Sequence, residues 1–329
     1  MSDRCAIVLH DHVPDTARPD EQDALVQAAE VGAALESLGY EIGPMSVGLD
    51  LTELKALRSG APALVFNLVE SLEGEGRFIH FAPAVLESLG IPFTGASSTA
   101  MLLTSNKLLA KRAMAAAGIP TAPWIEGPDK TFGRIGKSVL CIVKSVWEHA
   151  SIGIDASSIV PADEIGPVMA NRQSRFGGTW FAERFIQGRE FNISVLDGPD
   201  SPQVLPLAEI VFQGYGDGEP LIVDYAAKWD PESPKFHGTP RRFDTLDPAS
   251  PLARQIGDLT LACWHTFELT GYARVDFRID DKGRPWVLEV NANPCLSSDA
   301  GFMAAAAEVG LDPTAVVRRI ADAALARRN

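Results

Sequence analysis

Two stretches near the C-terminal end of the chain carry polar side chains at alternate positions. The stretch ARVDFR places Arg274 and Asp276 two residues apart, and LEVNANP places Glu289 and Asn291 two residues apart. Side chains two residues apart on a β-strand point to the same face of a sheet. If the two stretches are neighbouring strands, their arginine, carboxylate and amide groups can therefore meet on one face.

The apolar residues between them favour one particular pairing of these strands. A two-residue turn at 282–283 makes Asp276 face Glu289 and Arg274 face Asn291. A shift of one residue would mix polar and apolar side chains on each face, so the pattern favours this register. The same register pairs Val275 with Val290, Phe277 with Leu288, and Ile279 with Trp286.

Two facing carboxylates indicate either a bound cation or a well-solvated surface, because directly opposed like charges repel each other across a sheet. Two carboxylates and an amide oxygen form a ligand set suited to Mg²⁺, which keeps water and phosphate as further ligands. Arg274 beside such a metal could neutralise charge that develops on a transferred phosphoryl or acyl group. The alternative is an ordinary solvated hairpin, and the pattern alone leaves both interpretations open.

Lysines and glutamates upstream follow an order that is typical of nucleotide binding. Lys107 lies in the first turn of a predicted helix, and Lys144 ends a predicted strand. Glu183 and Glu190 flank residues 187–188, which we interpret as the tight turn of a hairpin. Each residue alone is typical of a surface charge. Together they give two lysines that can reach phosphates, then an acid for a ribose, then the metal hairpin.

Composition excludes several classes of partner. The 329 residues predict two or three packed units. A net charge of −14 argues against nucleic acid, which needs clustered Lys and Arg. No apolar run reaches the length of a membrane span, and the N-terminus shows no signal-peptide pattern. The four scattered cysteines predict a reduced, cytoplasmic protein without structural zinc.

Strands and helices alternate over the first hundred residues. Apolar runs predict strands at 5–10, 62–69 and from 91, and periodic patterns predict helices at 21–39 and 80–89. This alternation is typical of an α/β fold with a doubly wound parallel sheet. Later elements predict further α+β units, with a helix at 104–117, strands at 138–145, 179–186 and 189–196, a helix at 250–271, and strands at 272–280 and 284–292.

The order of these motifs resembles the ATP-grasp superfamily, and within it the D-alanine–D-alanine ligase-like branch. The resemblance runs from about residue 60 to the C-terminus, and it implies three domains at 1–104, 105–187 and 188–329. The first would bind substrate, and the other two would clasp ATP between them. The motifs that carry it are GIPFTGASSTAMLLTSNKLLAKRAMAAAGIPT, IVKSVWEHASIGI, AERFIQGREFNISVL, DYAAKW, ARVDFR and LEVNANPCLSS.

The resemblance implies a binding site for ATP and two Mg²⁺ ions, for which Mn²⁺ can substitute. Lys107 and Lys144 would hold the phosphates, and Glu190 would meet the ribose. The adenine-bearing edge would consist of Glu183 with Phe185 or Ile186. The metal ligands would be Asp276, Glu289 and Asn291.

The same resemblance implies residues for catalysis. Arg274 and the backbone after Pro294 would stabilise the tetrahedral intermediate. Lys228 would reach the γ-phosphate when the loop DYAAKW closes and excludes water. Ser151 belongs to the loop that covers the phosphates.

The chemistry implied is an ATP-dependent carboxylate–amine ligase. ATP phosphorylates a small-molecule carboxylate, and an amine attacks the acyl phosphate to form an amide, with ADP and phosphate released. Amino acids are the expected substrates. A carboxylate kinase that stops at phosphoryl transfer and a non-catalytic ATP-binding regulator are the alternatives. A homodimer through the N-terminal domain is common in this branch.

Departures from the branch fall on the amino-acid pocket. The segment at 67–80 lacks the His-Gly pair of the D-alanyl ligases, and His149 and Ala150 stand in place of Gly and Ser. Trp229 replaces the usual Tyr, and Cys295 replaces a Gly. We therefore predict that the enzyme joins a carboxylate and an amine other than two D-alanines.

Several residues could contact those substrates. One of four acids in the N-terminal segment could hold an α-ammonium group, namely Asp20, Glu21, Glu70 or Glu73. His80 and His149 are further candidates, although a structural role is more typical of each. We interpret Cys295 as a small residue in a tight turn, because this chemistry needs no covalent enzyme intermediate.

Overall fold

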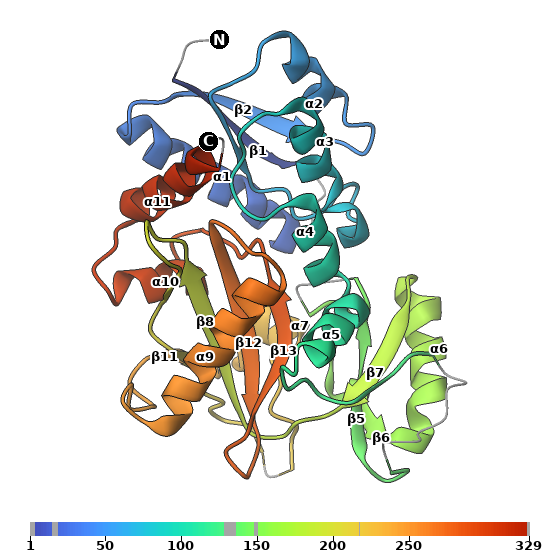
Figure 1. The fold of residues 1–329 in the computed structure, drawn as a ribbon. Helices are drawn as coiled ribbons and strands as arrows, with labels where there is room; N and C mark the ends of the chain where they lie inside the picture. Colours follow the sequence, from blue (N-terminus) through green and yellow to red (C-terminus); the bar gives the residue numbers. More distant parts are fainter. Residues whose placement is uncertain (1–3, 15–18, 128–135, 148–150, 217, 328–329) are drawn as a thin grey trace.

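The computed structural model describes residues 4–14, 19–127, 136–147, 151–216 and 218–327. The chain forms a parallel sheet near the N-terminus and two antiparallel sheets after it (Figure 1). This arrangement is an α+β fold, as predicted. Helices α11 and α1 pack together beside the N-terminal sheet, so the first and last helices of the chain lie in the same part of the molecule.

The N-terminal sheet is parallel and carries helices on both faces, which confirms the doubly wound prediction. Alternate residues of its central strand point to opposite sides, so Ala6 and Val8 pack with α1 and α11, whereas Ile7 and Leu9 pack with α2 and α3. The strands, in the order β2-β1-β3, are β1 (Cys5–Asp11), β2 (Glu41–Val47) and β3 (Leu64–Asn67). The helices are α1 (Pro19–Ser37), α2 (Thr52–Ala56), α3 (Phe81–Leu89) and α11 (Pro313–Ala326).

Two features of this region differ from the sequence prediction. The strand expected from residue 91 is reduced to one parallel bridge between Phe93 and Val65. The sequence analysis also missed β2 and α2. In β2 the segment EIGPMSV contains Gly43 and Pro44, and its partly exposed residues show no alternation of apolar and polar types.

The middle of the chain forms a four-stranded antiparallel sheet covered by one long helix. Its core contains Val143, Phe181 and Met169. The strands, in the order β4-β7-β5-β6, are β4 (Trp124–Ile125), β5 (Leu140–Ser145), β6 (Ile159–Pro161) and β7 (Trp180–Arg184), and the helix is α6 (Ile165–Phe176).

The helix predicted at 104–117 is divided in two. Helix α4 (Ser98–Ser105) ends one residue before Asn106, whose extended backbone begins α5 (Lys107–Ala116). The side-chain oxygen of Asn106 accepts hydrogen bonds from the backbone N–H groups of Leu108 and Leu109, each at 3.0 Å. This N-cap satisfies donors that a helix start leaves free, and it places Lys107 in the first turn, as predicted.

The third sheet carries the polar residues of the predicted hairpin. One face of this sheet packs on α9 (Pro251–Thr266) through Phe191, Val275, Phe277 and Val290. The strands, in the order β11-β10-β8-β12-β13 with β9 beside β8, are β8 (Arg189–Leu196), β9 (Gln203–Val204), β10 (Ala208–Ile210), β11 (Arg241–Arg242), β12 (Tyr272–Ile279) and β13 (Pro285–Asn291). The remaining helices are α7 (Tyr225–Trp229), α8 (Pro234–His237) and α10 (Gly301–Ala307), with short 3-10 turns at Leu57–Ser59, Gly76–Phe78, Ala156–Ser158 and Ala162–Glu164.

The predicted hairpin at 187–188 is wrong. Strands β7 and β8 belong to different sheets, so this segment is a crossover rather than a turn between paired strands. Gly188 has a φ of 145°, and a Cβ there would lie 1.9 Å from the backbone oxygen of Ile279. The glycine is therefore required where the chain passes close to the end of β12.

The register of β12 and β13 is confirmed at the polar end and wrong at the turn end. Asp276 faces Glu289, Arg274 faces Asn291, and Val275 faces Val290. A bulge after Asp276 then shifts the pairing, so that Phe277 faces Val287, Arg278 faces Trp286, and Ile279 faces Pro285. The cause is a three-residue turn at 281–283 with Gly283 at a φ of 72°, and the bulge restores the alignment of the carboxylates.

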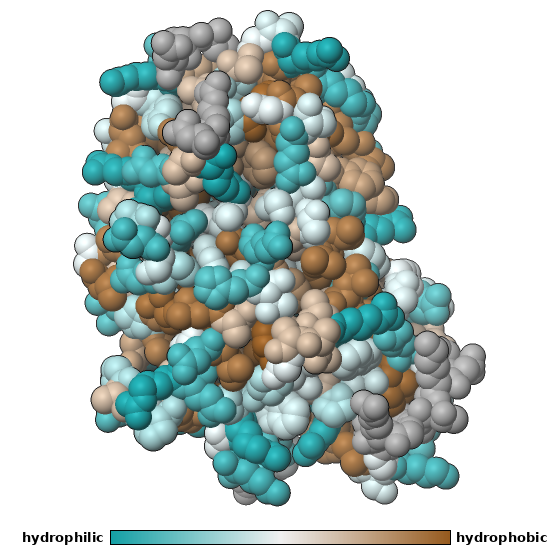
Figure 2. Space-filling view, in the orientation of Figure 1, coloured by the Kyte–Doolittle hydropathy of each residue, from teal (hydrophilic) through white to brown (hydrophobic). Residues whose placement is uncertain are grey.

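No helix within the described ranges is long and apolar enough to cross a membrane. On the face shown in Figure 2, hydrophobic residues are interspersed with hydrophilic ones.

Candidate active site

The face of the third sheet that points away from α9 is lined by charged side chains from three neighbouring strands. Register places Glu190 of β8 opposite Arg278 of β12, and Asp276 of β12 opposite Glu289 of β13. Because residues directly opposite each other share a face, these groups lie together on the side away from α9. The predicted residues of β8, β12 and β13 are thus brought together.

Arg274 and Asp276 form a paired contact along β12. The Nε of Arg274 lies 2.7 Å from Oδ1 of Asp276, and its Nη2 lies 2.8 Å from Oδ2. Burial of the guanidinium opposes its charge, but the carboxylates of Asp276, Glu289 and Glu190 together outweigh burial and raise the pKa of Arg274 above its ordinary value. Arg274 therefore holds one of the two facing carboxylates in place.

Lys107 approaches the second carboxylate from α5. Its Nζ lies 3.9 Å from Oε2 of Glu289. The backbone N–H of Lys107 donates to the carbonyl of Val146 at 3.0 Å, which ties the start of α5 to the end of β5. The two lysines predicted for phosphate binding thus come from elements joined by a hydrogen bond, and both lie next to the facing carboxylates.

Glu183 is held between two lysines, one of which the sequence analysis missed. Its Oε1 lies 2.8 Å from Nζ of Lys144, and its Oε2 lies 2.6 Å from Nζ of Lys111. Burial alone would raise the pKa of Glu183, but the two ammonium groups outweigh burial and hold that pKa below its ordinary value. Lys144 also interacts electrostatically with Glu289 and Glu190, so it faces the third sheet.

Lys111 is almost wholly buried, with 2% of its side chain exposed. It also donates to Oγ1 of Thr121 at 2.7 Å and to the carbonyl of Ala122 at 3.0 Å. The only signal in the sequence is its position four residues after Lys107, which places both lysines on one side of the helix. A single charged residue in this pattern does not distinguish a buried ion pair from a surface charge.

Glu190 is paired with Arg278, which the sequence analysis also missed. The Nη2 of Arg278 lies 2.9 Å from Oε2 of Glu190, and its Nη1 donates to the carbonyl of Gly188 at 2.9 Å. It also donates to the carbonyl of Leu221. Burial raises the pKa of Glu190, and Arg278 opposes this effect. Arg278 thereby links the predicted ribose acid to the crossover and to the loop before α7.

The predicted adenine edge lies beside this arginine. The Phe185 ring centroid is 5.9 Å from Cζ of Arg278, and the Phe212 ring is 5.5 Å away. Ile186 is buried in the same segment.

Ser151 contacts the segment just before α7, the helix that carries Lys228. The hydroxyl of Ser151 donates to the carbonyl of Val223 at 2.9 Å, just before the Asp224 N-cap of α7. Lys228 on α7 keeps contact with solvent, yet it is closely surrounded by protein atoms. This desolvation lowers the pKa of Lys228, and the nearby charge of Arg274 lowers it further. The charges of Lys228 and Arg274 thus interact with each other.

Of the four candidate acids in the N-terminal segment, Glu70 is the one that the structure places near these residues. Its charge interacts with Lys228, and its Oε1 accepts a hydrogen bond from Gln27 at 3.4 Å. Although the side chain is accessible to solvent, crowding by protein atoms raises the pKa of Glu70 to about 7, and the neighbouring charges of Asp11 and Asp23 add to this effect. Glu70 therefore lies in an acidic region opposite the third sheet.

The other residues that were predicted to contact the substrates are not shown to lie near these charged groups. Glu73 lies in an exposed turn with a φ of 53°. His80 packs edge-on against Phe81, with ring centroids 4.7 Å apart. His149 and the side chains of Asp20 and Glu21 lie outside the described residues.

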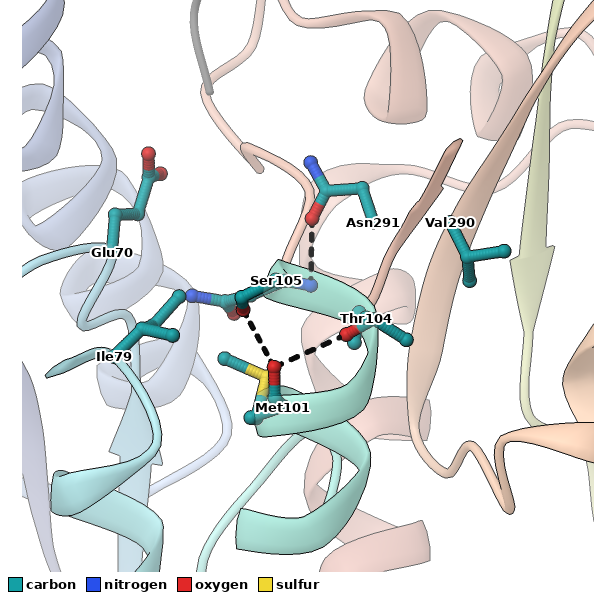
Figure 3. A pocket seen from close by; sticks show the side chains of 9 residues that line it. Glu70, Ile79, Met101, Thr104, Ser105, Val290 and Asn291 are labelled. Atoms are coloured by element: carbon teal, nitrogen blue, oxygen red, sulfur yellow. Dashed lines mark hydrogen bonds between the residues drawn. The ribbon is translucent and has the colours of Figure 1, made fainter. Parts of the chain in front are cut away.

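A small cavity of about 40 Å³ separates Glu70 from the end of β13 (Figure 3). Ile79 and Met101 form its apolar wall, and Asn291 lies at its other side. The Oδ1 of Asn291 accepts a hydrogen bond from the backbone N–H of Asn293 at 2.9 Å. This volume suits a few water molecules rather than a substrate.

Helix α1 holds the turn that follows β13. The side-chain oxygen of Gln27 accepts from the N–H of Leu296 at 2.8 Å, and the Glu30 carboxylate accepts from the N–H of Ser298 at 2.6 Å. The Cys295 thiol donates to Asp23 at 3.0 Å, and burial raises the pKa of this thiol. A protonated, hydrogen-bonded thiol is consistent with a structural Cys295 in this turn.

Comparison with known proteins decides the family. Residues 114–322 match the family described as D-ala D-ala ligase C-terminus. A D-alanine–D-alanine ligase of Moorella thermoacetica is 31% identical over 319 residues, which cover 93% of this chain and 96% of that protein. The chain belongs to the D-alanine–D-alanine ligase-like family of the ATP-grasp fold.

Two further proteins are similar to this D-alanine–D-alanine ligase-like chain. An uncharacterized protein of Sinorhizobium fredii, y4sG, is 29% identical over 304 residues, or 90% of this chain and 87% of that one. The crystal structure of a D-alanine–D-alanine ligase from Bacillus anthracis complexed with ATP has a TM-score of 0.77. It is 22% identical, and the match covers 99% of this chain and 98% of that chain, so it shows a shared fold.

The facing acids of this D-alanine–D-alanine ligase-like chain form a donor set that fits Mg²⁺. In the described part of the chain, no three His, Cys, Asp or Glu side chains form a metal cluster. Asp276 and Glu289 face each other, and Asn291 follows two residues later on the same face. The carbonyl oxygen of the Asn291 amide has a second lone pair beyond its bond to Asn293.

Proposed function

We propose that this chain is an ATP-dependent carboxylate–amine ligase that joins two amino-acid-like substrates through an acyl phosphate. The observation that carries the proposal is the facing pair Asp276 and Glu289, with Lys107, Lys144 and Arg274 around it. This arrangement combines a donor set for Mg²⁺ with cations for phosphate. Phosphoryl transfer relies on positioning and charge stabilisation of this kind.

ATP would lie between the second and third sheets. Lys144, positioned by Glu183, and Lys107, positioned by the Asn106 cap, would bind its phosphates. Glu190 would accept a hydrogen bond from a ribose hydroxyl, and Glu183, Phe185 and Ile186 would border the adenine. Lys228 would approach the γ-phosphate from α7, next to Arg274.

Asp276, Glu289 and Asn291 would hold two Mg²⁺ ions. When bound, these ions supply charge neutralisation on the phosphates and orient the transferred group. Arg274 keeps Asp276 oriented and presents its guanidinium to charge that develops as the amide forms.

Glu70 would bind the α-ammonium group of the amino acid whose carboxylate is phosphorylated. Across the small cavity, Glu70 lies on the side away from the third sheet, in a region that also contains Asp11 and Asp23. Two departures from the branch, Trp229 and Cys295, support substrates other than two D-alanines.

Three domains at 1–104, 105–187 and 188–329 remain part of this proposal, and each contains one of the three sheets. A homodimer and a cytoplasmic location also remain predictions.

The test is ADP release with Mg²⁺ and ATP against a matrix of paired L- and D-amino acids, with mass spectrometry of the products. ADP together with a product of the mass of both acids minus water supports the ligase and names its substrates. ADP that forms with one carboxylate and no amine, trapped by hydroxylamine as a hydroxamate without any amide, favours the kinase. ATP binding without ADP release from any pair contradicts the joining of two amino acids and favours a kinase of another carboxylate or the non-catalytic regulator.

A further inference from the structure

Arg241 lies on the edge strand of the third sheet and belongs to its polar face. Register places Arg241 opposite Ile210, Ile210 opposite Glu190, and Glu190 opposite Arg278. Residues directly opposite each other share a face. Arg241 therefore shares the face of Glu190 and Asp276, whereas its neighbour Arg242 lies opposite Glu209 on the other face.

Arg241 lacks the carboxylate partner that the other arginines of this sheet have. Arg242 donates two hydrogen bonds to the carboxylate of Asp244, from Nε at 2.9 Å and from Nη2 at 2.6 Å. The other arginines of the sheet form the ion pairs Arg189–Glu209, Arg274–Asp276 and Arg278–Glu190. Within the described residues, no carboxylate lies within 4 Å of the Arg241 guanidinium, and its buried Nε has no hydrogen-bond partner. Burial of a polar atom without a hydrogen-bond partner is costly, and because the side chain of Arg241 is only partly buried, its guanidinium stays open to a ligand.

The guanidinium of Arg241 lies against Gly301. A Cβ at Gly301 would lie 3.2 Å from Nε, 3.3 Å from Nη2 and 3.4 Å from Cζ of Arg241. The guanidinium thus packs directly on the start of α10, just after the turn that α1 holds. The charge of Arg241 is repelled by that of Arg274 and attracted by that of the exposed Asp299.

The two substrates of the proposed reaction differ in what they need from this region. The first amino acid gives up its carboxylate to phosphorylation, and its ammonium group would be met by the acidic region around Glu70. The second provides its amine, and its own carboxylate stays ionised and needs a cation. Arg274 is held by Asp276 through two hydrogen bonds. The charge of Arg241 interacts with that of Arg274, and Arg241 has no carboxylate partner among the described residues.

We infer that Arg241 binds a carboxylate of the amine substrate and selects amino acids over simple amines. The inference rests on the proposed ligase function, and it deepens that function by giving a chemical class to the second substrate. An arginine can bind a carboxylate with two parallel hydrogen bonds, which provides orientation as well as charge.

The test compares each amine substrate found in the ADP-release matrix with its carboxamide, which removes the negative charge and keeps the amine. The enzymes are the wild type, Arg241→Gln, Arg241→Lys and the matched control Arg242→Gln. We expect Arg241→Gln to lower kcat/KM for the acid by about 100-fold, mainly through KM, because one partner of a charged pair is lost. The loss for the carboxamide should be less than about threefold. Arg241→Lys should recover part of the loss, and Arg242→Gln should behave as the wild type.

A second measurement separates this inference from the ligase proposal. Titration calorimetry of L- and D-alanine, L- and D-glutamate and their carboxamides, with Mg²⁺ and ADP present, reports binding without turnover. Weaker binding of the acids to Arg241→Gln, with carboxamides unaffected, supports the inference even where no amide forms. Equal losses for acid and carboxamide, or acids that bind the wild type no better than carboxamides, would overturn it and leave the ligase proposal standing if amides form.

Discussion

At the scale of single residues, the charged groups of this protein are defined by their partners. Lys144 and Lys111 share the carboxylate of Glu183, and this sharing orients Lys144 toward the third sheet. Removal of one partner from a buried ion pair leaves an uncompensated charge, which costs more than the pair contributes. The site is therefore a network in which each side chain depends on a neighbour.

Replacement of Glu289 by Gln keeps the side-chain shape and removes one of the two facing charges. We expect Glu289→Gln to lower turnover by about 1000-fold, since the metal site would lose a charged ligand. The fold should be retained, because the Glu289 side chain is partly exposed and its ion pair with Lys107 is long, at 3.9 Å. The measurement is ADP release beside circular dichroism, with the exposed Glu308→Gln as control. Near-normal turnover would remove Glu289 from the metal site.

Glu70 gives a prediction of pH dependence. Its raised pKa, about 7, means that the carboxylate gains a proton as the pH falls through 7. A neutral Glu70 binds an ammonium group poorly, so kcat/KM for the first amino acid should fall by about tenfold per pH unit below that pKa. Glu70→Gln should show a low value at pH 8 and little change between pH 8 and 6. A wild-type profile in the variant would assign the ionisation to another group, such as Asp11.

The sequence identified most residues of the candidate site but not their partners. Asp276 and Glu289 could be paired in advance, because both lie on a local hairpin with alternating apolar residues. Lys111, Arg278 and Arg241 could not be assigned, because what surrounds them comes from distant parts of the chain. A buried lysine and a surface lysine look alike until the strand beside them is known.

At the scale of elements, local patterns predicted strands better than they predicted which strands pair. The alternation in β8 was clear, yet its partners are β12, β10 and β9, and not β7. The Gln187–Gly188 dipeptide is compatible with a tight turn, and only the separate sheets show that it is a crossover. Strand pairing depends on contacts across the whole sheet, which short segments do not encode.

Gly188 tests the crossover directly. With a φ of 145° and a Cβ position 1.9 Å from Ile279 O, Gly188→Ala requires the backbone to move. We expect a loss of roughly 3 kcal/mol in the free energy of unfolding. Gly178→Ala, at a φ of 69° with open space around it, should cost only about 1 kcal/mol. Urea denaturation measures both, and equal small losses would show that the crossover tolerates a side chain.

At the scale of the whole molecule, the C-terminal helix completes the N-terminal core. Val316, Val317 and Ile320 of α11 pack in one cluster with Ala6 and Phe66 of the first sheet. Helix α1 in turn binds the turn after β13 through Gln27 and Glu30. The first and last segments of the chain therefore form one structural unit, which a division into consecutive domains does not anticipate.

Ile320 allows this unit to be tested. Its side chain is fully buried, so Ile320→Ala should lower the free energy of unfolding by about 2–5 kcal/mol. The decisive measurement is hydrogen exchange. Amide protection should fall in β1 and β3, which are more than 250 residues away in sequence, and it should persist in β5, because the second sheet has its own core. The exposed Arg318→Ala should leave exchange unchanged. Loss of protection confined to α11, with β1 unaffected, would mean that the helix covers the N-terminal sheet without stabilising it.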